Sequence, residues 1–126
     1  MTATAPVLAR KRILFVDDDE DTRTMMNAML DLYGYEAVIA VSVSDALASA
    51  RSGGLALCIL DHWLTESNGI ELCQQIRAFD SGTPIMFYSG AAYDADIQKG
   101  LDAGAQAYLV KPDFDHQHHR PRLNRT

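Results

Sequence analysis

The sequence predicts a single α/β domain with a five-stranded parallel sheet and helices on both of its faces. Short apolar runs recur five times along the chain, and segments of about ten residues with helical spacing separate them. Strands and helices in such alternation form βαβ units, whose strands lie parallel. With 126 residues, of which 48% are apolar, the chain suffices for one domain with one core.

The expected strands are short apolar runs, and the third is the most continuous of them. In it, six apolar residues precede Asp61, which is typical of a strand that is buried on both faces. Glycine, proline and small polar residues between the runs indicate loops and turns. The expected strands span residues 13–16, 36–41, 55–60, 84–88 and 107–110.

The expected helices follow from apolar residues that recur every three or four positions and from residues typical of helix ends. Met25, Met29 and Tyr33 have this spacing in the first helix, which Gly34 ends. Ser44 is expected to cap the second helix and Asn68 the third. The expected helices span residues 19–33, 45–51, 69–79 and 94–103.

Charge and composition exclude several classes of function. A net charge of -6 argues against a nucleic acid as the direct partner. The first twelve residues lack the apolar core of a signal peptide, and no stretch approaches the roughly 20 apolar residues of a membrane span. Cys58 and Cys73 have the positions of small apolar residues, as in a reducing compartment. We therefore expect a cytoplasmic protein without membrane contact.

Polar residues with chemical potential follow directly after four of the five strands. Asp17 and Asp18 come after the first, Asp61 after the third, Ser89 after the fourth and Lys111 after the fifth. The carboxyl ends of parallel strands lie along one edge of the sheet, where open α/β folds bind their ligands. These five side chains are therefore expected on one rim.

The chemistry of this rim favours a phosphoryl site with a divalent cation. Carboxylates at 4 Å repel each other by about 4 kcal/mol per pair at an effective dielectric constant of 20, so three of them need a cation. Carboxylate, carbonyl and water oxygens are what Mg²⁺ prefers. Lys111 and the Ser89 hydroxyl would contact phosphoryl oxygens, and an aspartate can be the nucleophile that forms an aspartyl phosphate. Each feature alone is common on protein surfaces, and only their joint placement indicates a site.

Four motifs, in this order and at these spacings, carry a resemblance to a known family. They are Phe15-Val-Asp17-Asp18, Leu60-Asp61 with Asn68-Gly69, Tyr88-Ser89-Gly90-Ala91, and Tyr108-Leu-Val-Lys111-Pro112. From about Lys11 to Pro112 the chain resembles the receiver domains of two-component response regulators, in particular stand-alone receivers similar to chemotaxis regulators. The resemblance implies a flavodoxin-like three-layer sandwich with strand order 2-1-3-4-5.

The resemblance also implies what each residue of the rim does. Asp61 would accept a phosphoryl group from the phosphohistidine of a sensor histidine kinase or a histidine phosphotransfer protein. Asp18 would bind Mg²⁺ directly and Asp17 through water, with the backbone carbonyl of Trp63 as a further ligand. The protein would catalyse only its own phosphorylation and dephosphorylation, and would act on a downstream protein target.

Three further residues complete the implied switch. Lys111 would pair with the acyl phosphate and be held by a cis bond to Pro112. Ser89 would move toward the phosphoryl group, and Tyr108 would turn inward behind it as an aromatic switch. The added charge of roughly -1.5 to -2 would bias a two-state surface.

The chain departs from the family in three places. Thr65 stands where the family usually has proline, and the large indole of Trp63 is expected to shield the acyl phosphate from water. Residues 113–126 form an atypical tail in place of the fifth helix, with two large apolar residues and Pro121 inside. Apolar surface left uncovered there is expected to favour self-association or the docking of a neighbouring segment. The expected organisation is a flexible arm over 1–10, a receiver domain over 11–112 and this tail.

Two other functions remain open on the sequence alone. A Mg²⁺-dependent phosphatase of the haloacid-dehalogenase type also uses an aspartate after a strand, but its motif requires Thr or Val where this chain has Asp21. A protein-binding module that is not phosphorylated could keep the same fold.

Overall fold

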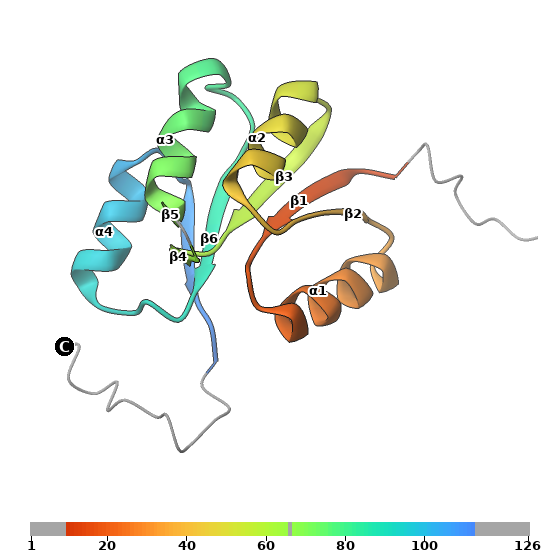
Figure 1. The fold of residues 1–126 in the computed structure, drawn as a ribbon, viewed down its shortest axis with the longest axis horizontal. Helices are drawn as coiled ribbons and strands as arrows, with labels where there is room; N and C mark the ends of the chain where they lie inside the picture. The colour runs from red at the N-terminus through yellow and green to blue at the C-terminus, as the bar shows by residue number, and fades with distance from the viewer. Residues whose placement is uncertain (1–9, 66, 113–126) are drawn as a thin grey trace, which may run out of the picture.

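The computed structural model describes residues 10–65 and 67–112, and it confirms the predicted parallel sheet. Five strands pair in the order β2-β1-β3-β6-β7, which is the predicted order 2-1-3-4-5 when the strands of this sheet alone are counted (Figure 1). Every pair in the sheet is parallel. The strands are β1 (Arg12–Val16), β2 (Glu36–Ala40), β3 (Leu55–Leu60), β6 (Ile85–Ser89) and β7 (Ala107–Val110).

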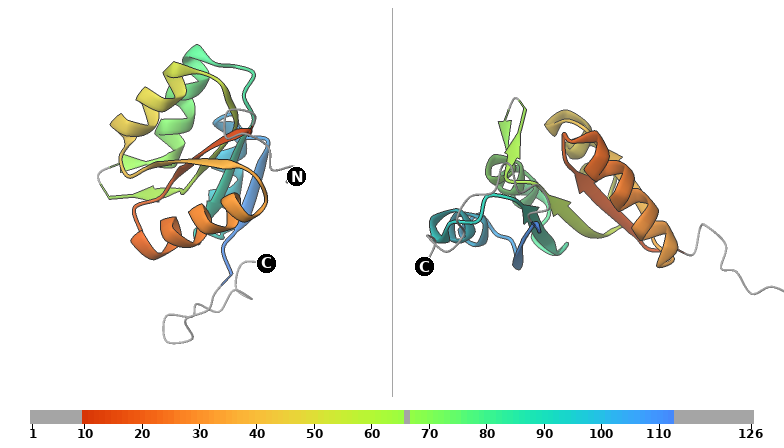
Figure 2. Two further views of the ribbon diagram at one scale, coloured as in Figure 1. Left: turned by 90° about the vertical axis from the view of Figure 1, so that its right-hand side faces the viewer. Right: turned by 90° about the horizontal axis from the view of Figure 1, so that it is seen from below.

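The helices of the described residues lie on both faces of this sheet. Helices α2, α3 and α4 cover one face, and α1 lies on the other, as the two views of Figure 2 show. None of these helices is long and apolar enough to span a bilayer. Their bounds are α1 (Glu20–Leu32), α2 (Val43–Ser52), α3 (Gly69–Phe79) and α4 (Asp94–Asp102). The predicted flexible arm and tail fall almost entirely on residues 1–9 and 113–126, outside the described part.

The core divides into two layers because the side chains of a strand alternate between the two faces. In β1, Leu14 and Val16 join the larger cluster beneath α2 and α3, whereas Ile13 and Phe15 join the smaller one beneath α1. Both free cysteines are buried, and burial raises the pKa of Cys58 to about 12. The sheet therefore has an apolar cluster on each of its faces.

Three local features differ from the sequence predictions. Ser42, not Ser44, caps α2, because the helix starts at Val43 and the extended Ser42 accepts a hydrogen bond from the Asp45 N–H. A small antiparallel hairpin of β4 (Trp63–Leu64) and β5 (Ser67–Asn68) was not predicted, because strands of two residues leave no periodic pattern. The bond from Lys111 to Pro112 is trans, not cis; trans is the lower-energy isomer of an X-Pro bond.

Candidate functional site

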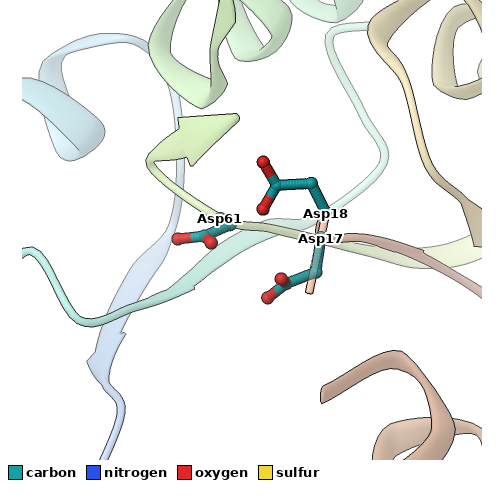
Figure 3. Close-up of side chains that lie close together, drawn as sticks. All are labelled: Asp17, Asp18 and Asp61. Atoms are coloured by element: carbon teal, nitrogen blue, oxygen red, sulfur yellow. The ribbon is translucent and has the colours of Figure 1, made fainter. Parts of the chain in front are cut away.

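The pairing of β1 with β3 brings the three predicted carboxylates together. Val16 lies opposite Leu60 in this pair, and the Asp61 N–H donates to the Val16 carbonyl at 3.1 Å. One carboxylate oxygen from each of Asp17, Asp18 and Asp61 lies within 4.8 Å of the other two (Figure 3). The acids that follow two different strands thus form one cluster on the rim, as the sequence predicts.

Asp17 is the buried member of the cluster. Its carboxylate accepts a hydrogen bond from Lys111 Nζ at 2.8 Å and another from the Asp19 N–H at 2.9 Å. Burial raises the pKa of Asp17, and the charge of Asp61 adds to this effect, although the hydrogen bonds from Lys111 and Asp19 oppose it. The Arg23 guanidinium also donates a hydrogen bond to the backbone carbonyl of Asp17, at 3.0 Å. Asp17 is therefore held in one position by groups on both sides.

Lys111 bridges Asp17 and Asp61. Its Nζ lies 3.4 Å from Asp61 Oδ2, while its backbone N–H donates to the Ser89 carbonyl at 2.9 Å. Burial disfavours the charge of Lys111, but the hydrogen bond that it donates to Asp17 and the charges of the two nearby carboxylates outweigh burial and raise its pKa. Lys111 therefore carries its positive charge at neutral pH, directly beside Asp61.

Asp18 is the exposed member of the cluster, and it has a partner that the sequence did not reveal. The Thr65 hydroxyl, in the turn of the β4–β5 hairpin, donates a hydrogen bond to Asp18 Oδ2. Thr65 stands where the family usually has proline, so this chain replaces a rigid residue by a polar tether. The hairpin also places Trp63, which is 61% exposed, beside the cluster.

Ser89 and Asp61 face a common cleft. Ser89 is fully buried at the end of β6, and its hydroxyl accepts a hydrogen bond from the Ala91 N–H at 3.1 Å. A cleft of about 420 Å³ lies over Asp61, which is 8% exposed. Its lining residues are Asp61, Trp63, Ser89, Gly90, Ala91, Ala92, Tyr93 and Asp96. Asp61 thus has two acids and a lysine on one side and open space on the other.

Tyr108 points toward this loop and has a partner that the sequence analysis missed. Its hydroxyl donates to the Ala91 carbonyl at 2.7 Å and lies 3.1 Å from Nδ1 of His62, which is 3% exposed. Burial raises the pKa of Tyr108 to about 12, against the effect of a hydrogen bond with Ser89. The sequence does hold a signal for His62: this polar residue stands between Asp61 and Trp63, directly after the most apolar strand.

Gly69, part of the second motif, has a steric reason to be glycine. A Cβ on this residue would overlap the backbone oxygen of Asp61 and come within 2.9 Å of the Phe87 ring. The Gly69 N–H donates to the His62 carbonyl at 2.7 Å. The start of α3 therefore lies directly against the backbone of the central aspartate and fixes its position.

The donor set at the cluster fits Mg²⁺. Three carboxylates and one lysine ammonium leave two uncompensated negative charges within the same small volume. All the donor atoms are oxygens, and Asp18 leaves one side of the cluster open to water, as a hydrated divalent ion requires. The cluster therefore has the charge and the ligand chemistry of a magnesium site.

Comparison with known proteins agrees with this geometry. The profile of the response regulator receiver domain family matches residues 13–121. The DNA-binding response regulator MtrA of Mycolicibacterium smegmatis is 37% identical over 103 residues, which are 82% of this chain and 45% of that protein. The alkaline phosphatase synthesis transcriptional regulatory protein PhoP of Bacillus subtilis is 34% identical over 102 residues, with coverage of 81% and 42%. The chain spans less than half the length of these curated relatives.

Solved structures show the same fold. The chemotaxis protein CheY4 of Vibrio cholerae superimposes with a TM-score of 0.78 at 30% identity, covering 83% of this chain and 89% of its own. The response regulator protein TrrA of Thermotoga maritima, in complex with Mg(2+)-BeF, gives a TM-score of 0.73 at 31% identity, with coverage of 85% and 92%. These matches favour a phosphoacceptor over the haloacid-dehalogenase-type phosphatase and over a module that is not phosphorylated. The chain belongs to the response regulator receiver domain family.

Proposed function

We propose that Asp61 is the phosphoacceptor of a two-component phosphorelay and that Lys111 and Ser89 assist the transfer. The observation that carries the proposal is the position of the Asp61 carboxylate. It has Asp17, Asp18 and Lys111 on one side and the cleft toward Ser89 on the other. An incoming phosphoryl group would approach Asp61 from the cleft, on the side away from Asp17 and Asp18.

In the proposed reaction an oxygen of Asp61 attacks the phosphorus of a phosphohistidine. The bond from phosphorus to the imidazole nitrogen breaks, the imidazole leaves with the electron pair, and Asp61 becomes an acyl phosphate. Lys111 would turn its Nζ from Asp17 toward the new phosphoryl oxygens, and the Ser89 hydroxyl would donate to another. Apart from the attack by Asp61, the protein needs to supply little covalent chemistry, because phosphoryl transfer depends mainly on the positioning of the reactants and on charge neutralisation.

Mg²⁺ is the cofactor we propose for this site. Asp17, Asp18, Asp61 and the backbone carbonyl of Trp63 would hold it, and when bound it would neutralise the negative charge shared by the carboxylates and the phosphoryl group. Asp18 would be a direct ligand. Asp17, already bonded to Lys111 and to the Asp19 N–H, would act through water.

The lifetime of the acyl phosphate would be set by water at the cleft. We propose that water hydrolyses it without a second enzyme and that Trp63 slows this step. The indole is 61% exposed and lies at the mouth of the cleft that Asp61 lines. A large apolar ring at this position would keep water from the phosphorus.

The phosphoryl donor we propose is a sensor histidine kinase or a histidine phosphotransfer protein, and the output is binding to a downstream protein. Phosphorylation would act on that output through Ser89 and Tyr108. The named relatives MtrA and PhoP are transcriptional or DNA-binding regulators of more than twice the aligned length. The net charge of -6 argues against direct binding of this chain to a nucleic acid, and this stays a prediction.

A second copy of the chain is a further proposed partner. Among the described helices, α1 alone lies on its face of the sheet, where it contacts β1 and β2. Beside it, Tyr88 of β6 lies next to Leu109 of β7, which is 53% exposed. Met25 and Met29 of α1 are more than 40% exposed and extend the apolar surface. Light scattering at increasing concentration would show a dimer that Leu109→Lys abolishes; a monomer at all concentrations would contradict self-association.

Acetyl phosphate with Mg²⁺ tests the proposed function of Asp61. We expect an adduct on the protein that is stable to acid and labile to base, and that Asp61→Asn lacks. A control variant, Asp102→Asn, removes an exposed acid of α4 and should label like the parent. Turnover of phosphoesters without an adduct would support a phosphatase instead, and neither reaction would support a binding module.

A further inference from the structure

His62 is a buried polar group that phosphoryl transfer to Asp61 does not use. It follows Asp61 in the chain, yet its ring is 3% exposed and turns to the cluster of Phe87 and Tyr108. The ring centroid lies 6.1 Å from that of Phe87 and 6.3 Å from that of Tyr108, while Trp63 lies at 4.6 Å. An imidazole in such surroundings needs a hydrogen-bond partner, and the Tyr108 hydroxyl provides one.

The protons of this contact can be assigned from the hydrogen bonds alone. The Tyr108 hydroxyl has one proton, and the carbonyl of Ala91, at 2.7 Å, can only accept. The hydroxyl therefore donates its one hydrogen bond to the Ala91 carbonyl, and its oxygen is left to accept a hydrogen bond. Nδ1 of His62 lies 3.1 Å away and must carry the proton that it donates. His62 is accordingly present with its hydrogen on Nδ1.

Contacts with Phe87 and Gly100 favour the same inward position of the Tyr108 ring. The ring stacks on Phe87 with centroids 5.3 Å apart and planes at 15°. A Cβ on Gly100, in α4, would come within 2.8 Å of Tyr108 Cδ2 and 3.0 Å of Phe87 Cδ1. Because Gly100 has no side chain, the inward ring fits between α4 and His62. Two independent features thus select one position of the ring.

We propose that His62 is the positioning residue of Tyr108: its Nδ1–H holds the tyrosine ring inward before any phosphoryl group arrives. The single hydroxyl of Tyr108 then connects three segments, namely the end of β3 through His62, the loop after β6 through Ala91, and β7 itself. The His62 carbonyl ties α3 to the same point through the Gly69 N–H at 2.7 Å. In this protein the equilibrium of the ring and of the Ser89–Ala91 loop is therefore biased toward the inward arrangement before phosphorylation.

The size of the effect follows from one hydrogen bond. A buried hydrogen bond is worth a net change of about fivefold in an equilibrium constant. Removing the His62 donor should therefore lower the ratio of inward to outward Tyr108 by about fivefold. The proposal concerns the protein without phosphate, so it stands or falls separately from phosphorylation of Asp61.

The tautomer of His62 is the first test. An imidazole that only filled space, without donating a hydrogen bond to Tyr108, would have no reason to carry its hydrogen on Nδ1. Long-range proton–nitrogen NMR spectra of the ¹⁵N-labelled, unphosphorylated protein should show the hydrogen of the neutral His62 ring on Nδ1. In Tyr108→Phe the acceptor is gone, and the hydrogen should shift to Nε2, because Nε2–H is the favoured tautomer of a neutral imidazole in water. An Nε2–H tautomer in the parent protein would overturn the proposal.

Two replacements of His62 provide the second test. His62→Asn keeps an amide N–H close to the place of Nδ1, whereas His62→Leu fills the space without a donor. Nuclear Overhauser contacts between the Tyr108 ring and Ala91 should persist in His62→Asn and weaken in His62→Leu, as a roughly fivefold lower ratio of inward to outward Tyr108 requires. Equal contacts in both variants would contradict the proposal. If His62→Leu does not fold, the tautomer measurement decides alone.

Discussion

The crowding of Asp17, Asp18 and Asp61 predicts that one substitution changes stability in opposite directions with and without Mg²⁺. At 4.8 Å, two carboxylates repel each other by about 3.5 kcal/mol at an effective dielectric constant of 20 and by about 0.9 kcal/mol in bulk water. Asp18 is exposed, so the lower value applies to it. In the absence of divalent ions, Asp18→Asn should therefore stabilise the protein by about 1 kcal/mol. The asparagine oxygen can still accept from Thr65, so no other contact is lost.

With Mg²⁺ the order should invert. An ion at a hundredfold excess over its Kd stabilises the folded protein by about 2.7 kcal/mol. For a domain of this size that corresponds to a rise in Tm of roughly 10–20 °C. Asp18→Asn removes a ligand, binds Mg²⁺ more weakly and should gain only a small part of this rise.

Thermal unfolding followed by circular dichroism, in EDTA and in MgCl₂ at constant ionic strength, measures both effects. Trp63 is the only tryptophan and lies beside the cluster, so its fluorescence reports binding of the ion directly. Asp102→Asn controls for the general loss of one negative charge. The reasoning is refuted if Asp18→Asn is less stable than the parent in EDTA, or if it gains as much from Mg²⁺.

Three further predictions follow from single contacts. Trp63→Asn should shorten the lifetime of the phosphoryl group in a discharge assay, and an unchanged rate would remove the shielding role of the indole. Gly69→Ala should cost about 1–3 kcal/mol in urea unfolding, because its Cβ would overlap the Asp61 carbonyl; a variant as stable as the parent would argue against this close contact. Hydrogen bonds from the Thr83 hydroxyl and nearby N–H groups lower the pKa of Asp80, so they stabilise the folded state above pH 3.8 and are lost as the pH falls below it. The free energy of unfolding should therefore fall below pH 3.8 in the parent, and it should fall less in Asp80→Asn. Equal pH profiles of the two proteins would contradict a stabilising role of the Asp80 carboxylate.

The sequence predicted the sheet and the rim well, and the physical reason is the same for both. A parallel strand buried on two faces, such as Leu55–Leu60, appears in the sequence as a continuous apolar run, so its end and the residue that follows are easy to locate. Once Asp17 and Asp61 are known to follow neighbouring parallel strands, their proximity is a property of the sheet. Asn68 was likewise identified as the cap of α3, because its side chain and position match the cap rule.

What the sequence did not predict depends on contacts between side chains far apart in the chain. In the sequence, Thr65 stands out only because the family usually has proline there, and the structure alone shows that its hydroxyl donates a hydrogen bond to Asp18. The bond between His62 and Tyr108 joins residues 46 positions apart, and the need for glycine at position 100 arises from the same ring. No periodicity carries such information, because each contact depends on how α4, β3 and β7 are finally placed.

Mapping the phosphorylated residue tests most directly whether the acids meet around one divalent ion and leave Asp61 free to accept phosphorus. The protein is treated with a phosphodonor in Mg²⁺ or in EDTA, reduced with borohydride and digested, and the converted residue is identified by tandem mass spectrometry. We expect conversion at Asp61 alone, in Mg²⁺ and not in EDTA. Conversion at another acid, or equal conversion at Asp61 without a divalent ion, would contradict the proposed site.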